Sequence, residues 1–410
     1  MNSNIDFLIV GAGLYGVTVG RILTDLGYQC LIVEKNNHIG GLCYDTVMND
    51  GLYHMHQHGA HVFHTDNIIA QKFFTSYCQL NNYVHSEIIE DETGNIFSLP
   101  INLMTLRQVY GLNKREEILN KLEGEQFAAS AIYGNRTDAE AIASIKFGKT
   151  IYEKLIKDFI EKKYLKECKD LPGSIIEHIN LNLDYDFIYF GNEICGLPMD
   201  GYTSTLGRII DGDCNDGENH RPIPCLLNID IKDNIKNWIS LPNRNIIYCG
   251  AIDELLEYKL GQLEWKSLEI LSAPYECTGD NTQGIAVINY INKKSNITRA
   301  VEHSQFYKER ITPEVCPFDS IISFEQSVNF DPQKNQRYYA INDEKNNKLF
   351  NEYLQLLGKE YPNVLCGGRL GKYKNLDMDE TILEAILDAR NINAFYKNIE
   401  KENNDRSTGE

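Results

Sequence analysis

The 410-residue chain lacks the features of several protein classes. No apolar run approaches the roughly 18 residues that a membrane-spanning helix needs, so we expect no membrane span. The 11 cysteines are odd in number and contain no Cys-x-x-Cys pair, which argues against a disulfide framework or a zinc ribbon. The N-terminus lacks a basic segment and a small-residue cleavage site, so we expect no signal peptide. These absences predict a cytoplasmic protein.

Positive charge is also scarce. Lys and Arg number 40 against 58 Asp and Glu, which gives a net charge of −18. A surface of this sign repels phosphate backbones, so nucleic acid is not an expected partner. Any anionic substrate therefore needs a local basic pocket that works against the overall field.

Hydrophobic residues make up 42% of the chain, enough for a core divided over two or three subdomains. The pattern of apolar residues predicts an α/β protein that opens with a strand, a helix and a strand within about 30 residues. We expect a strand at 5–10, a helix at 14–26, a strand at 30–33, helices over 96–170, short strands over 185–340, a helix at 343–360, a strand at 363–369 and a helix at 377–398. The polar segment 211–224 is expected to be an exposed surface loop.

The first turn carries a dinucleotide fingerprint. Gly11-Ala12-Gly13-Leu14-Tyr15-Gly16 has the pattern Gly-x-Gly-x-x-Gly between the predicted strand and helix. Gly11 permits the tight turn, Gly13 lets the backbone approach a pyrophosphate, and Gly16 lets the helix pack on the strand. Glu34 ends the second strand, where a carboxylate can accept hydrogen bonds from a ribose. Strand, helix, strand and acid together predict a dinucleotide site.

The residues after Glu34 favour FAD over NAD. Lys35 follows directly, and Gly40-Gly41 come five residues later. This extension resembles the large FAD-binding superfamily that includes the amine oxidases. The sequence therefore predicts a Rossmann-like FAD-binding domain.

Five of the ten histidines lie within eleven residues, at His54, His56, His58, His61 and His64. Imidazole is a common metal ligand. However, no Cys, Asp or Glu joins these histidines before Asp66, so we expect them to pack or hydrogen-bond beside the cofactor, with no metal.

The segment His58-Gly59-Ala60-His61-Val62-Phe63-His64-Thr65 resembles a motif of the UDP-galactopyranose mutase family. Further similar segments follow in the family's order from about residue 5 to 395. They are SLPIN at 98–102, GLP at 196–198, GYT at 201–203, YCGAID at 248–253, LEWKSL at 263–268, TRAVEH at 298–303, GGRL at 367–370 and Asp377-Met378.

The resemblance implies a fold of three parts: a discontinuous FAD-binding domain, a helical bundle and a six-stranded antiparallel sheet. We assign 1–80, 202–255 and 340–400 to the first part, and 98–185 to the second. The sheet domain takes 81–97, 186–201 and 256–339, and 401–410 is expected to be a disordered tail.

The resemblance also implies the chemistry of a sugar mutase. N5 of reduced FAD attacks the anomeric carbon of a nucleotide sugar, and the flavin N5–sugar adduct allows pyranose and furanose forms to interconvert. The protein then holds the diphosphate and orients the sugar. NAD(P)H or another flavin reductant and a homodimeric assembly complete the expected partners.

Family positions imply roles for individual residues. The resemblance places Arg299, Arg369, His61 and His64 at the reacting centre. Residues implied around the cofactor are Gly11, Gly13, Leu14, Tyr15, Gly16, Glu34, Lys35, Gly41, Leu42, His61, Val62, Arg369, Leu376, Asp377 and Met378. Substrate positions that keep a family residue type are Phe159, Tyr189, Arg299 and Tyr339.

Other substrate positions depart from the family. Tyr164 stands where a tryptophan is expected, Asn182 where an arginine clamps the diphosphate, Asn375 where a tyrosine is expected, and His85 where an asparagine faces the sugar. Lys162, Lys163 and Lys166 offer replacement cations, although a lysine is not a bidentate clamp. We therefore expect the flavin chemistry, with either UDP-galactose or another activated sugar as the substrate. The alternatives are another reaction on an activated sugar, or a redox-only FAD protein.

Overall fold

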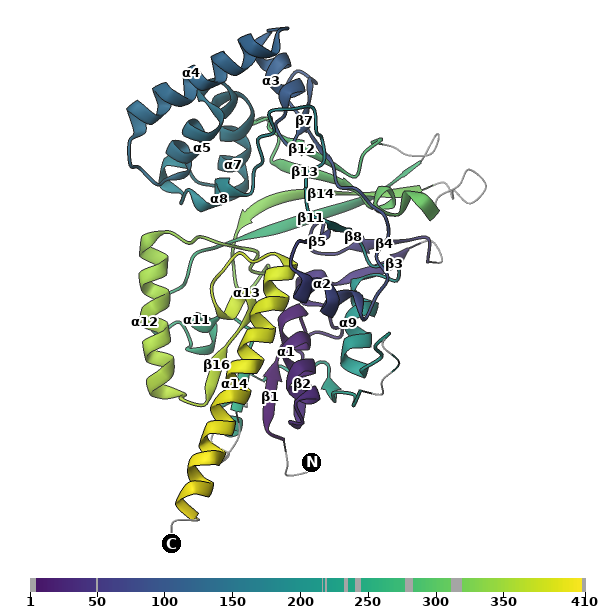
Figure 1. Ribbon diagram of the computed structural model, residues 1–410, viewed down its shortest axis with the longest axis vertical. Coiled ribbons are helices and arrows are strands. Elements are labelled where there is room, and N and C mark those ends of the chain that lie inside the picture. The colour runs from purple at the N-terminus through teal and green to yellow at the C-terminus, as the bar shows by residue number, and fades with distance from the viewer. Residues whose placement is uncertain are drawn as a thin grey trace.

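The computed structural model describes residues 5–48, 51–215, 217, 220–231, 235–239, 245–276, 283–310 and 319–407. Figure 1 shows three parts: a group of helices at the top, a long sheet across the middle, and a parallel sheet with its flanking helices below. One cluster of buried hydrophobic side chains lies among the upper helices, and two lie on the two faces of the parallel sheet; the middle sheet contributes residues to these clusters.

The lower sheet is five-stranded and wholly parallel. Its order is β16-β10-β1-β2-β9. The strands are β1 (Phe7–Val10), β2 (Cys30–Val33), β9 (Cys225–Leu226), β10 (Asn245–Tyr248) and β16 (Val364–Cys366). Both faces are covered, because Ile9 packs in one hydrophobic cluster and Leu8 in another. This arrangement confirms the predicted Rossmann-like unit.

Helices α1 (Leu14–Asp25) and α14 (Met378–Ser407) cover one face of this sheet, and α11 (Ile252–Leu255) and α12 (Glu344–Glu360) cover the other. The predicted helices at 14–26 and 343–360 match α1 and α12 closely. The expected disordered tail at 401–410 is wrong as far as Ser407, because α14 continues to that residue; 408–410 lie outside the described residues.

The middle sheet has seven strands in the order β15-β11-β14-β13-β12-β6-β7. They are β6 (Glu87–Glu90), β7 (Ile96–Leu99), β11 (Trp265–Glu276), β12 (Val287–Tyr290), β13 (Ile297–Glu302), β14 (Asp319–Asn329) and β15 (Tyr339–Ala340). The expectation of six antiparallel strands is wrong in two respects. A short seventh strand, β15, joins the edge, and β12 pairs with β6 in parallel.

The upper helices lie between 103 and 177. They are α3 (Leu103–Tyr110), α4 (Arg115–Tyr133), α5 (Ala139–Phe147), α6 (Lys149–Ile151), α7 (Lys157–Tyr164) and α8 (Ser174–Glu177). The predicted helical stretch of 96–170 therefore starts too early, because its first four residues form β7. A single π-helical turn, Tyr152–Ile156, leads into α7. Such turns are often found at functional sites.

Two short sheets join these parts. Strand β3 (Asp45–Met48) pairs with β4 (Tyr53–His56), and β5 (Phe63–Thr65) pairs with β8 (Ile194–Gly196). Helix α2 (Ile68–Thr75) follows β5. Within 186–201, β8 thus pairs with β5 and not with the seven-stranded sheet.

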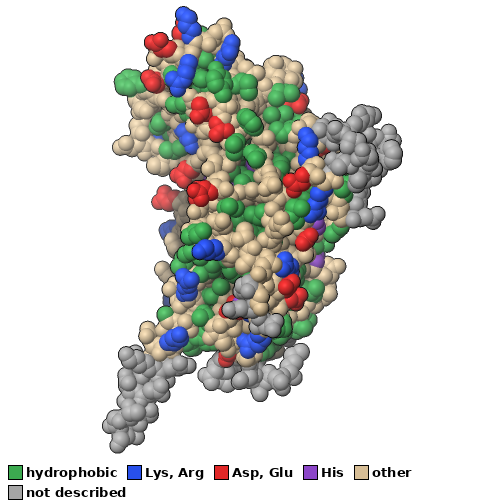
Figure 2. All heavy atoms as spheres, turned by 45° about the vertical axis from the view of Figure 1, so that its right-hand side comes forward, with side chains coloured by type: hydrophobic (Ala, Val, Ile, Leu, Met, Phe, Trp, Pro, Cys, Tyr) green, Lys and Arg blue, Asp and Glu red, His purple; other side chains and the backbone are tan. Residues whose placement is uncertain are grey.

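Helix α9 (Tyr202–Asp211) interrupts the region predicted to hold short strands, and so does α10 (Ile235–Ile239). The described part of 211–224 is not wholly exposed, because Ile223 is buried. Acidic and basic side chains are interspersed on the face shown in Figure 2. Among the described residues, no helix is both long enough and apolar enough to span a membrane.

Candidate active site

The turn between β1 and α1 leaves a free helix N-terminus. A Cβ atom added to Gly16 would lie 2.1 Å from the carbonyl oxygen of Gly11, so only glycine allows this close packing. Gly13 precedes the helix, and no side chain caps it. The first amides of α1 are therefore open to an anion such as a pyrophosphate.

A second loop lies against this turn. Gly41 has φ +57°, and a Cβ atom there would come within 3.1 Å of the Gly13 Cα atom. Both oxygens of the buried Glu34 carboxylate accept backbone hydrogen bonds, from Ala12 at 2.8 Å and from Asn36 at 2.9 Å. Lys35 is exposed. The narrow glycine-walled cradle and its acid suit the adenosine end of a dinucleotide.

The cradle adjoins the C-terminal segment predicted to touch the cofactor. The backbone of Gly367–Gly368, at the start of α13 (Gly368–Gly371), packs against the ring of Tyr15. The Cys43 Sγ atom lies 3.9 Å from the Met378 Sδ atom. These two contacts hold the segment that carries Arg369 and Met378 against the cradle.

Beyond these residues lies a cavity of about 480 Å³. Its walls come from the upper helices, the seven-stranded sheet and the segments beside the parallel sheet. Twelve residues predicted for the site line it: Val62, His64, His85, Phe159, Tyr164, Tyr189, Arg299, Tyr339, Arg369, Asn375, Leu376 and Asp377. Three cations face it, Lys163, Arg299 and Arg369, as an anionic ligand of an acidic protein requires.

Arg299 is held at the cavity wall by a buried polar network. Its Nε atom lies 3.4 Å from Asn289 Oδ1 and 3.9 Å from Glu325 Oε2. Asn289 in turn donates to Glu87 Oε2 at 2.7 Å, and His85 Nε2 lies 2.8 Å from Glu87 Oε1. Although burial opposes it, the charge of Arg299 with the bonds from His85 and Asn289 lowers the pKa of Glu87 to about 2. The network thus fixes a permanent cation beside the cavity.

Arg369 keeps a donor free. One terminal nitrogen donates to the Tyr338 carbonyl oxygen at 3.0 Å, while its buried Nε atom has no partner among the described residues. A buried donor without a partner is costly, so a bound acceptor would stabilise it. This open donor suits the predicted position of the flavin.

His61 does not line the cavity, although its chain neighbours Ala60 and Val62 do. Its amide donates to His56 Nδ1 at 3.1 Å, and its own Nδ1 lies 2.8 Å from the Gly59 carbonyl oxygen. Burial and the nearby Arg369 lower the pKa of His61 to about 4. The ring is therefore neutral at pH 7, with Nδ1 as the donor to Gly59 and Nε2 as an acceptor that has no hydrogen-bond partner in the described part of the chain.

Aromatic stacking holds two other histidines, His64 and His85, in the cavity lining. His64 stacks on Phe190 at 3.7 Å between ring centroids, and His85 stacks on Phe190 at 5.0 Å. Sequence reasoning missed Phe190. Its only signal was adjacency to Tyr189.

Two of the departures from the family have other partners. Asn375 lines the cavity, but its amide pairs with both the amide and the carbonyl oxygen of Ala340, each at 2.9 Å. Asn182 does not line the cavity, and its side chain lies 3.5 Å from the Asp186 carbonyl oxygen. Asn375 therefore positions the strand that carries Tyr339.

The three replacement lysines differ in their partners and in whether they line the cavity. Lys162 donates to the carbonyl oxygens of Asn292, Ser295 and Ile297, and Lys166 pairs with Glu264 at 2.6 Å. Only Lys163 lines the cavity. Glu87 and Asn289, also missed from the sequence, line it too, because strands far apart in the chain bring them together.

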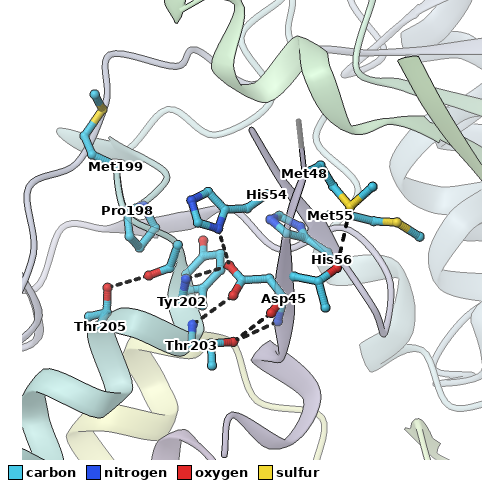
Figure 3. A network of polar contacts seen from close by, with 12 residues as sticks. Asp45, Met48, His54, Met55, His56, Pro198, Met199, Tyr202, Thr203 and Thr205 are labelled. Atoms are coloured by element: carbon cyan, nitrogen blue, oxygen red, sulfur yellow. Dashed lines mark hydrogen bonds and ion pairs between the residues drawn. The ribbon is translucent and has the colours of Figure 1, made fainter. Parts of the chain in front are cut away.

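A second buried network supports the histidine-rich strand (Figure 3). The Asp45 carboxylate accepts hydrogen bonds from the amides of Tyr202 at 2.7 Å and Thr203 at 3.0 Å, which cap α9. His54 Nδ1 lies 3.8 Å from this carboxylate, and burial lowers the pKa of His54. The described residues contain no group of three or more His, Cys, Asp or Glu arranged to hold a metal.

The cradle and the parallel sheet define a Rossmann-type dinucleotide-binding protein, and residues 9–77 match the family model of NAD(P)-binding Rossmann-like domains. Residues 154–375 match the model of UDP-galactopyranose mutase. The chain belongs to the UDP-galactopyranose mutase family.

Curated relatives cover nearly the whole chain. It is 30% identical to the UDP-galactopyranose mutase of Mycoplasma genitalium over 402 residues, covering 95% of both chains. It is 29% identical to the dTDP-fucopyranose mutase of Escherichia coli over 384 residues, covering 92% of this chain and 96% of the relative. A crystal structure of reduced UDP-galactopyranose mutase has the same fold, with a TM-score of 0.72, 14% identity and coverage of 96% and 95%.

Proposed function

We propose that the chain is a flavin-dependent mutase that interconverts the pyranose and furanose forms of a nucleotide-activated sugar. The observation that carries this proposal is the cavity of about 480 Å³, whose walls hold the cations Arg299 and Arg369 together with the aromatic rings of Phe159 and Tyr189. Such a cavity has cations for a diphosphate and aromatic rings for a base.

FAD is the proposed cofactor, with its adenosine end in the cradle and its flavin beside Arg369 and Met378. The reduced flavin would supply the nucleophile for the anomeric carbon. The chain's own residues would then bind and orient the substrate. NAD(P)H is the proposed reductant.

Individual roles follow from the contacts. Arg299, which the Glu87–Asn289 network holds in place, would neutralise the diphosphate as it leaves and returns. The free Nε donor of Arg369 would bind an acceptor atom on the cofactor. His61, which is neutral, would accept a hydrogen bond from the cofactor or the substrate at Nε2 without adding a positive charge to the site.

The sugar is left open by the relatives, because a UDP-galactopyranose mutase and a dTDP-fucopyranose mutase match almost equally well. Of the residues that depart from the family pattern at the substrate side, His85, Tyr164 and Asn375 line the cavity, whereas Asn182 does not. We propose a substrate other than UDP-galactose within the class of nucleoside diphosphate hexoses.

The test uses FAD-loaded, dithionite-reduced protein with a panel of UDP- and dTDP-hexopyranoses, UDP-galactose included, and chromatography of the products. We expect furanose formation from one preferred sugar, only with reduced protein, and a loss of about 10–100-fold in kcat/KM for Arg299→Lys. Arg208→Lys, at the exposed Arg208–Asp213 pair, is the matched control. No furanose from any sugar would contradict the mutase function, and efficient turnover of UDP-galactose alone would contradict the changed substrate.

A further inference from the structure

Lys163 is a cation that the network around Arg299 leaves without a counterion. It lies on α7 and lines the cavity. Its Nζ atom lies 4.7 Å from the ring centroid of Tyr339, 5.8 Å from that of Tyr164 and 5.9 Å from that of Phe159. In the described part of the chain, no carboxylate comes within ion-pair distance of this atom.

The neighbouring cations are compensated differently. Arg299 has Glu325 at 3.9 Å and the charge of Glu87 nearby. Lys162 and Lys166, on either side of Lys163, are satisfied by carbonyl oxygens and by Glu264. Lys163 has aromatic rings beside it, and the carboxylates of Glu325, Glu87 and Asp377 act on it only from beyond ion-pair distance. Together these groups repay part of the cost of burying an ammonium group but not all of it.

A ligand can supply the missing charge. Of the three parts of a nucleotide sugar, the base and the hexose are neutral, and only the diphosphate is anionic. Its two phosphates carry about two negative charges, and Lys163 and Arg299 are both cations of the cavity lining. Resting on the proposed function, we propose that Lys163 binds the substrate diphosphate together with Arg299.

The charged groups around Lys163 also predict how the affinity for the diphosphate depends on pH. Burial and the charge of Arg299 lower the pKa of Lys163 to about 8. The other groups that face it come from separate elements: Glu87 on β6, Glu325 on β14, Tyr339 on β15, Asp377 before α14 and Tyr164 on α7. Because the ammonium form binds the anion, affinity stays constant below pH 8 and falls as Lys163 loses its proton above it.

The experiment measures dissociation constants of FAD-loaded protein for UDP and dTDP by calorimetry, and for uridine and thymidine by competition. Lys163→Gln should weaken the diphosphates about 10–100-fold and leave the nucleosides unchanged. Lys154→Gln is the matched control, because Lys154 also lies over a ring, that of Phe97, but is exposed and outside the cavity. Equal diphosphate affinity in wild type and Lys163→Gln would overturn the proposal.

The pH dependence of binding tests the same proposal with a second variant, Lys163→Arg, which keeps a positive charge at position 163. Between pH 7 and 9, where the uracil base stays largely neutral, the wild-type dissociation constant for UDP should rise above pH 8, whereas Lys163→Arg should bind with no such rise. An identical rise in Lys163→Arg would overturn the proposal even if Lys163→Gln did not fold. If the wild type bound neither UDP nor dTDP, the proposed mutase function would be contradicted. If it bound both with an affinity that does not depend on Lys163, only the proposed role of Lys163 would be contradicted.

Discussion

At the scale of single residues, Glu87 holds the site together. Its carboxylate receives bonds from His85 and Asn289 and faces the charge of Arg299, and its pKa is lowered from an ordinary 4.5 to about 2. At about 1.4 kcal/mol per tenfold change in proton affinity, this corresponds to roughly 3 kcal/mol of stability. A lowered carboxyl pKa stabilises the fold fully above pH 4.5, and the contribution is lost as pH falls towards 2.

Glu87→Gln should therefore lower the free energy of unfolding by roughly 2–3 kcal/mol at pH 7, because its amide must also turn a donor towards His85 or Asn289. Thermal melts from pH 6 to 3 should show the difference from wild type shrinking as the acid limit is approached. Glu90→Gln, on the same strand β6, is the control and should change little. A constant difference at every pH would show that the charge of Glu87 is not involved.

Sequence reasoning named twelve of the residues that line the cavity, because they lie in or beside segments that resemble the family's motifs. It missed Glu87, Asn289 and Phe190, whose roles depend on strands and loops far apart in the chain. It also named Asn182 as the position where the clamping arginine is replaced, and three lysines as replacement cations. Only packing distinguishes them: Lys162 and Lys166 have local partners, Asn182 does not reach the cavity, and Lys163 faces it.

At the scale of elements, the β3–β4 hairpin depends on its contact with α9. Asp45 caps the N-terminus of α9 through the amides of Tyr202 and Thr203, and Thr203 Oγ1 bonds back to the Asp45 backbone (Figure 3). Removing a buried cap of this kind costs about 1–2 kcal/mol, and leaving two amides unpaired adds to it.

We expect Asp45→Ala to destabilise the protein by about 2–3 kcal/mol in urea denaturation. It should also loosen the 53–65 segment that carries His61. Asp213→Asn, at the exposed C-terminal end of the same helix, should change stability by less than about 0.5 kcal/mol. If both variants unfolded at the same urea concentration, the proposed cap would make no contribution to the stability of the protein.

Element prediction succeeded where a single pattern was strong. Strands β1 and β2 and helices α1 and α12 have clear periodicity and sit close to their predicted bounds. Helix α9 was missed because it is short, lies among strand-rich segments and takes its cap from Asp45, more than 150 residues earlier. The parallel pairing of β12 with β6 was missed for a similar reason, since strands so far apart in sequence leave no local signal.

At the scale of the whole molecule, the cavity is the meeting point of all three parts. Helix α7 contributes Phe159 and Lys163, the seven-stranded sheet contributes Arg299, and the segments beside the parallel sheet contribute Arg369 and Asp377. A ligand in the cavity therefore touches elements whose hydrophobic clusters are otherwise largely separate. Its binding energy should be shared among them, because it stabilises only the arrangement in which they meet.

UDP or dTDP at about 100 times its dissociation constant should stabilise the FAD-loaded protein by about 2.7 kcal/mol. Hydrogen exchange should then slow in α7, in β13 and in 369–377 together, because each part loses a local opening motion when the ligand links it to the others. Inorganic phosphate at the same concentration is the control, since it is too small to reach all three. Protection confined to one part would mean that the ligand does not bridge the cavity, and the three parts would then have to be treated as independent units that meet without a shared substrate.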